Sequence, residues 1–151
     1  MKVLAIVFAV LAAASGAGVW WLVQLAGGTG LGLAELYVNA HPLTKLTDLS
    51  IGLMTVATLV LGLVRGKGGA PIGGALLRLM IWLAAGLGLL AALQAGLSTW
   101  RAAAMVHVTD LRVVAPGLAE ALIPFLLGCI CAALAAALSP SSRPATAAVF
   151  E

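Results

Sequence analysis

The stretch LAEALIPFLLGCICAALAAAL, residues 118–138, decides the fold, because Glu120 is the single charged side chain in an otherwise apolar run. A helix of this length rises about 1.5 Å per residue and measures roughly 31 Å, close to the thickness of a bilayer's hydrocarbon core. The sequence therefore predicts that this segment crosses a membrane as a helix.

Composition extends this prediction to the whole chain. Hydrophobic residues make up 63% and charged residues 9%, and the mean hydropathy is +1.16, far from the values of soluble domains. Three further apolar runs cover residues 3–26, 49–64 and 75–100. None alternates with the period of two that a membrane β-barrel requires. We expect an all-α membrane protein, one membrane domain over residues 1–151 with four transmembrane helices and no soluble domain.

The N-terminal run also resembles a secretory signal, since MKVLAIVFAVLAAASG has a lysine, an apolar centre and small residues. The apolar run continues through GVWWLVQLA, so we expect a retained helix, with cleavage as the alternative. Loop cations favour both termini inside, because positively charged loops stay in the cytoplasm. The inner set would be Lys2, Arg65, Lys67, Arg78 and Arg143, and the outer set Lys45, Arg101 and Arg112.

The residues that could bind a metal or a haem are few. Cys129 and Cys131 are two residues apart on one predicted helix, which puts them about 200° apart around its axis, so they cannot chelate one metal. We favour a role as small buried hydrophobic side chains. His41 and His107 could ligate a haem between helices. Both fall in predicted outer loops, however. Each precedes a Thr-Asp pair, Thr47 and Asp48 or Thr109 and Asp110, and Thr or Asp there would cap the following helix. We expect no metal and no cofactor.

The motifs of other functional classes are absent from the sequence. No nucleotide-binding loop, nucleophile triad or metal box occurs, so we do not expect an enzyme. The eight cations mostly flank the spans, which gives no support to nucleic-acid binding.

Small residues crowd two spans. LAAGLGLLAALQAG, residues 83–96, and the alanines that follow Gly128 would let backbones approach closely. This pattern favours packing against further copies of the chain, and a compact monomeric bundle is the alternative.

Glu120 is the residue that needs an explanation. We expect it in the first turn of its helix, where the positive end of the helix dipole favours an anion. Pro124 lacks the amide that would bond to the carbonyl of Glu120, which predicts a kink. From the residues alone, a carboxylate facing a pore and one facing the membrane surface both stay open.

Two motifs add a family resemblance. VAPGLAEALI, residues 114–123, resembles the start of the last membrane helix in TolQ and ExbB, the channel-forming subunits of bacterial proton-driven motors. LGLLAAL, residues 87–93, is similar to the preceding helix of that family and to the flagellar stator protein MotA. The resemblance covers roughly residues 82–138 at matching spacing.

The resemblance implies a pentamer in the bacterial inner membrane, around a single-span partner of the ExbD, TolR or MotB type that supplies an intramembrane aspartate. Glu120 matches the family's pore-lining glutamate at the outer mouth of an ion path. Ala92 and Phe125 stand where the family has threonines, and the large cytoplasmic domain is missing. The candidate pore-lining residues are Glu120, Ala92, Phe125, Pro124 and Gln94.

The favoured hypothesis is therefore a channel-forming motor subunit driven by the proton-motive force. The alternative is a non-conducting scaffold or a holin-like pore, which would need no aspartate-bearing partner. A small multidrug-type transporter would usually carry its essential glutamate in the first helix, which holds no acid here.

Overall fold

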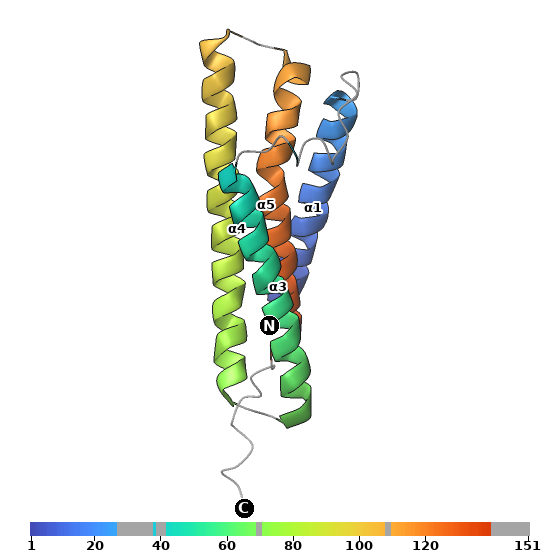
Figure 1. Ribbon diagram of the computed structural model, residues 1–151. Coiled ribbons are helices and arrows are strands. Elements are labelled where there is room, and N and C mark those ends of the chain that lie inside the picture. Colours follow the sequence, from blue (N-terminus) through green and yellow to red (C-terminus); the bar gives the residue numbers. More distant parts are fainter. Residues whose placement is uncertain (27–37, 39–41, 69–70, 108–109, 140–151) are drawn as a thin grey trace, which may run out of the picture.

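The computed structural model describes residues 1–26, 38, 42–68, 71–107 and 110–139, and every regular element among them is a helix (Figure 1). The predicted His41 and Arg143 positions lie outside the described residues. Four helices are long and apolar enough to cross a membrane, as predicted. They are α1 (Lys2–Ala26), α3 (Pro42–Gly68), α4 (Pro71–Met105) and α5 (Leu111–Leu138).

Helix α5 holds the bundle together. It packs against α1, α4 and α3, and α3 also packs against α4. Helices α1 and α4 run in one direction and α3 and α5 in the other, so the chain starts and α5 ends toward the same end of the bundle (Figure 1). This antiparallel order is compatible with termini on one side of a membrane, and the N-in, C-in orientation stays a prediction.

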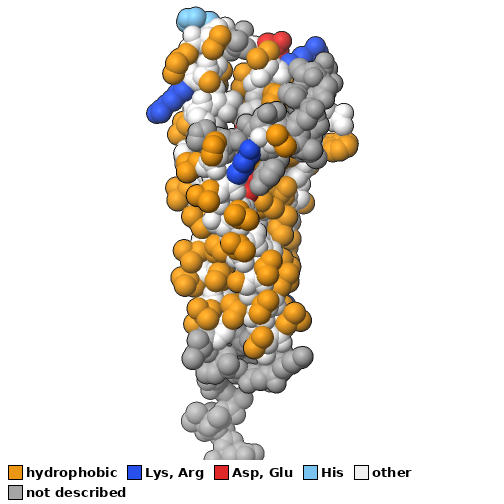
Figure 2. Space-filling model, viewed as in Figure 1, with side chains coloured by type: hydrophobic (Ala, Val, Ile, Leu, Met, Phe, Trp, Pro, Cys, Tyr) orange, Lys and Arg blue, Asp and Glu red, His pale blue; other side chains and the backbone are white. Residues whose placement is uncertain are grey.

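The outer surface of the bundle is apolar. Side chains such as Leu53, Leu63 and Leu90 are more than half exposed. Figure 2 shows hydrophobic side chains over the lower part of the visible face, with the charged ones gathered toward the upper end. An exposed apolar belt of this extent is unfavourable in water and matches the hydrocarbon core of a bilayer.

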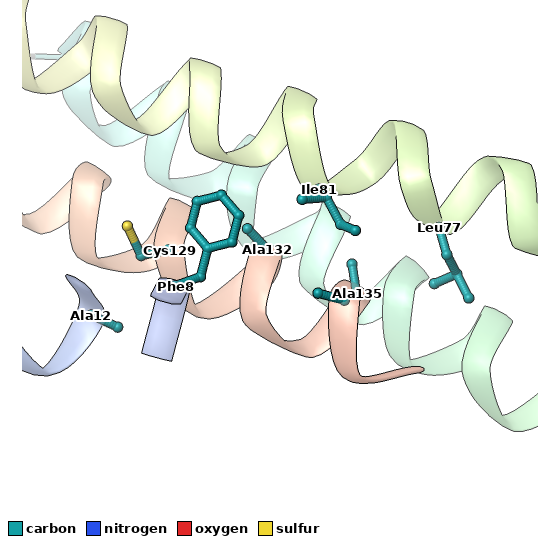
Figure 3. Close-up of a cluster of buried hydrophobic side chains, with 8 residues drawn as sticks. Phe8, Ala12, Leu77, Ile81, Cys129, Ala132 and Ala135 are labelled. Carbon is teal, nitrogen blue, oxygen red and sulfur yellow. The ribbon is translucent and has the colours of Figure 1, made fainter. Parts of the chain in front are cut away.

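The interior is built largely from small side chains. Phe8 of α1 and Ile81 of α4 meet Ala132 and Ala135 of α5 in one buried cluster (Figure 3). Alanine at these positions lets the helix backbones approach closely. The small residues of the third and fourth spans are thus used, at least in part, for packing within the chain.

Three helices are longer than their apolar runs. Helix α3 spans Pro42–Gly68 and not 49–64, α4 spans Pro71–Met105 and not 75–100, and α5 begins at Leu111 and not at residue 118. Polar residues interrupt an apolar run without ending the helix, because the backbone still bonds to itself. The start of α5 is set by Asp110, whose carboxylate accepts a hydrogen bond of 2.9 Å from the amide of Arg112.

Candidate functional site

A polar cavity of about 190 Å³ lies between α3, α4 and α5, toward the end of the bundle where α3 begins. Its wall combines hydroxyl, amide and carboxylate side chains with a few apolar ones. The lining residues are Leu43, Thr44, Thr47, Ala91, Gln94, Ala95, Ser98, Thr99 and Glu120.

Glu120 is the charged residue of this wall. It lies in the third turn of α5, half-buried, because the helix begins at Leu111. Nine residues of helix place it about 13 Å from that end, and the dipole effect falls off within the first turn. The expectation that the helix end stabilises Glu120 is therefore wrong, and Glu120 instead lines the cavity between α3, α4 and α5.

Asp48 is the residue that sequence reasoning missed. We expected it in an outer loop as a helix cap, but it lies within α3 with only 6% of its surface exposed. Its Oδ1 atom is buried and has no hydrogen-bond partner among the described residues. The carboxylate of Glu120 is near enough to repel that of Asp48. Two carboxylates thus lie on different helices, α3 and α5, both of which could cross a membrane.

Helix α3 has a polar face turned inward, and this pattern is the signal that would have revealed Asp48. Thr44, Asp48, Ile51 and Thr58 are spaced by four, three and seven residues and are all buried. This spacing keeps them on one face of a helix. The opposite face carries exposed leucines and valines, as expected for a helix whose outside is lipid.

The polar face continues past the cavity. Thr58 lies about 15 Å further along α3 than Asp48. Its hydroxyl is fully buried and lies 3.8 Å from the Sγ atom of Cys131 on α5. Polar atoms therefore occur at two levels of the contact between α3 and α5.

Three hydroxyl groups of the cavity wall donate hydrogen bonds to backbone carbonyls of their own helices. Thr47 donates to the carbonyl of Leu43 at 2.9 Å, while Ser98 and Thr99 donate to the carbonyl of Ala95 at 2.8 and 2.9 Å. A hydroxyl that donates in this way still has lone pairs with which to accept. Together with Glu120, these oxygens make the wall rich in acceptors, which suits a proton, another small cation or water.

The size of the cavity limits what it can hold. Pockets for drug-sized ligands measure about 300–1,000 Å³, so a cavity of about 190 Å³ is too small for them. A larger groove of about 440 Å³ lies next along the bundle, between the last turns of α4 and the first turns of α5, and its lining, which includes Trp100 and Leu118, holds no carboxylate. Several water molecules fit the smaller cavity, since one needs only about 10–15 Å³ of such space.

The structure brings only part of the predicted site together. Glu120 and Gln94 both line the polar cavity. Ala92 is half-buried on α4 and lies outside the lining. Pro124 is fully buried, with its carbonyl against Gly88, and Phe125 packs against the main apolar cluster. Pro124 and Phe125 thus serve the contact between α4 and α5.

The cysteine and histidine predictions have separate outcomes. Cys129 and Cys131 are free and buried, as predicted. His107 is exposed at the end of α4, where its φ of 53° turns the chain out of the helix. Among the described residues, no three His, Cys, Asp or Glu side chains come together as a metal site would require.

No protein-family model matches the chain, and neither the curated proteins nor the solved structures contain a match. The similarity to TolQ, ExbB and MotA therefore depends on the two sequence motifs alone.

Proposed function

We propose that this protein is the channel-forming subunit of a proton-driven motor in a bacterial inner membrane, and that protons enter its path through the cavity at Glu120. One observation carries the proposal. Asp48 of α3 is buried and Glu120 of α5 lines the cavity, and both carboxylates lie within apolar helices that could cross a membrane. Ionisable residues in such positions are costly and usually serve an ion pathway.

A proton is the cation that the site suits best. The cavity is small, its wall offers oxygen acceptors, and the described residues form no metal site. A proton needs only one acceptor at a time and can move through ordered water. The neutral hydroxyls of Thr47 and Ser98 would hold such water beside Glu120.

The motor part of the proposal depends on the resemblance. VAPGLAEALI and LGLLAAL place α4 and α5 where the family has its pore-lining helices. Five chains would then surround a single-span partner of the ExbD, TolR or MotB type. Force would be transmitted through the membrane, on the outer side or by another protein.

The rival function is a non-conducting scaffold or a holin-like pore. A scaffold gains nothing from burying Asp48, whose Oδ1 atom has no partner among the described residues. An unpartnered buried polar group costs roughly 1–3 kcal/mol. A site that binds a proton offsets this cost through its function, whereas a helix that only packs against its neighbours does not.

Native mass spectrometry of the gently solubilised complex tests the motor assembly. We expect five copies of the chain holding a small single-span protein with an aspartate inside its span. A monomer, or a ring of another order with nothing inside, would contradict the motor assembly. Proton transport is a separate readout, and Glu120→Gln should abolish it while leaving the assembly intact.

A further inference from the structure

We propose that one face of α4, here called the Gln94 seam, binds the same face of a second copy of this chain within the membrane. The inference goes beyond the proposed function, since it depends neither on proton transport nor on the number of chains in the complex. The seam consists of exposed side chains that recur every three or four residues along α4. They are Leu83, Leu87, Leu90, Gln94 and Leu97.

The first step of the argument is the spacing of these residues. Successive members of the seam are four, three, four and three residues apart, which is the heptad spacing with which two helices pack side by side. Helices in membranes mostly pack with the same geometry. Leu90 and Leu97 are 65% and 54% exposed, so the seam faces away from the other helices of its own chain. The chain therefore leaves a helix-packing surface uncovered.

The second step is the depth of Gln94. Arg78 and Arg101 mark the ends of the apolar part of α4 and are 23 residues, or about 35 Å, apart. Gln94 lies seven residues, or about 10 Å, inside the Arg101 end. Its side chain is exposed and forms no hydrogen bond with the described residues. Lipid offers neither donors nor acceptors, so an amide at this depth is unfavourable without a protein partner.

The third step identifies the partner as a second copy of the chain. The loop cations give every copy the same orientation in the membrane, so two seams side by side are parallel and bring their Gln94 residues to the same depth. An amide both donates and accepts hydrogen bonds, so the two Gln94 side chains can bond to each other. A single polar residue in an apolar heptad seam also fixes the register of the two helices.

The second copy also completes the polar cavity. Gln94 and Ser98 line this cavity and are both exposed, so the cavity wall is open beside the seam. The hydroxyl of Ser98 donates to the carbonyl of Ala95 at 2.8 Å and can still accept a hydrogen bond from the second copy. A helix docked on the seam covers the opening and screens the cavity beside Glu120 from lipid.

Oxidative cross-linking of the purified complex in lipid vesicles locates the contact. Leu90→Cys and Leu97→Cys each place a thiol in the seam, and we expect both to form a disulfide between two chains, seen as a two-chain band on a non-reducing gel. Leu89→Cys is the matched control and should give no band. Leu89 is also exposed, at 48%, but it points about 100° away from Leu90 around α4. The wild type should give no band either, since Cys129 and Cys131 are buried.

Energy transfer between labelled chains, measured over a range of lipid-to-protein ratios, tests the role of Gln94. Gln94→Leu should weaken self-association about five- to thirty-fold, because it removes hydrogen bonds between membrane helices. Gln94→Asn keeps an amide and should retain most of the association. Gln24→Leu is the control and should have no effect, because Gln24 is exposed near the end of α1, outside the seam.

The other outcomes overturn the inference. Equal disulfide yields from Leu89→Cys and Leu90→Cys would show random collisions between chains. Leu90→Cys and Leu97→Cys chains that form no two-chain product would show that no second copy docks on the seam. Unchanged association of Gln94→Leu would show that the copies do not pair through this amide. Intact cross-linking in a chain that transports no protons would leave the inference standing and would refute the proposed function.

Discussion

Gly88 of α4 packs directly against Gly128 of α5. A Cβ atom built on either glycine would lie 3.1 Å from the Cα atom of the other. The same Cβ atoms would lie 2.6 Å from backbone carbonyl oxygens, of Pro124 for Gly88 and of Ala84 for Gly128. The two helices thus cross at a contact that only glycine permits, and α4 and α5 are fixed there relative to the cavity at Glu120.

Gly88→Ala and Gly128→Ala should each destabilise the chain. The added methyl group meets backbone atoms that cannot move aside, and such overpacking costs about 1–3 kcal/mol. The free energy of unfolding, from a reversible detergent titration, measures the effect. Gly86→Ala and Gly96→Ala are the controls, since nothing lies within 4 Å of a Cβ atom at either position. Equal stability of all four variants would contradict the crossing.

A second close contact predicts a rescue. A Cβ atom on Gly117 of α5 would lie 2.7 Å from Cγ2 and 2.8 Å from Oγ1 of Thr99 on α4. Gly117→Ala alone should therefore destabilise the chain, and Thr99→Ala in the same chain should restore part of the loss. Residues in contact show coupling energies of about 0.5–3 kcal/mol in a double-mutant cycle. Additive effects would show that the two side chains do not meet.

The two aspartates should respond in opposite directions to the same change. Asp110 caps α5 through the amide of Arg112, so Asp110→Val should lower the free energy of unfolding by about 0.5–2 kcal/mol. Asp48 is buried with an unpartnered oxygen, so Asp48→Val should raise it by roughly 1–3 kcal/mol. Thermal unfolding in detergent compares the two variants. A large loss of stability in Asp48→Val would mean that its carboxylate serves the packing.

The thiols offer a test of how the α5 interior is packed. Cys129 is 1% exposed and Cys131 is fully buried. A water-soluble maleimide should label neither thiol in the folded chain and both after denaturation in sodium dodecyl sulfate, as counted by mass spectrometry. Rapid labelling of the folded chain would contradict the packing of α5 against α1, α4 and α3.

The sequence predicts the fold class well because lipid imposes a simple rule. Apolar runs long enough to cross a bilayer identify the four helices, and the close approach at Gly88 and Gly128 follows from the small residues around them. The helix starts are harder, because Asp48 and Arg112 lower the hydropathy of a window without ending the helix. Hydropathy indicates whether a segment lies in lipid or in water, and it does not indicate where a helix begins. Asp48 and Arg112 both lie within helices.

The site could be predicted only in part. The sequence indicates Glu120, since a lone carboxylate in an apolar run is conspicuous. The sequence predicts Asp48 in a loop because the apolar run begins one residue later. The spacing of Thr44, Asp48 and Thr58 is compatible with an inward face, but only the packing of α3 on α5 brings this face to the cavity that Glu120 lines.

Proton flux into liposomes tests the central claim most directly. The gently solubilised complex, with any small protein that co-purifies, is reconstituted with a pH-sensitive dye inside and a membrane potential imposed by potassium and valinomycin. We predict flux through the wild type and through Asp110→Asn, and flux reduced to the level of empty liposomes in Asp48→Asn and Glu120→Gln. Full flux through the latter two variants would contradict the assignment of the proton path to Asp48 and Glu120.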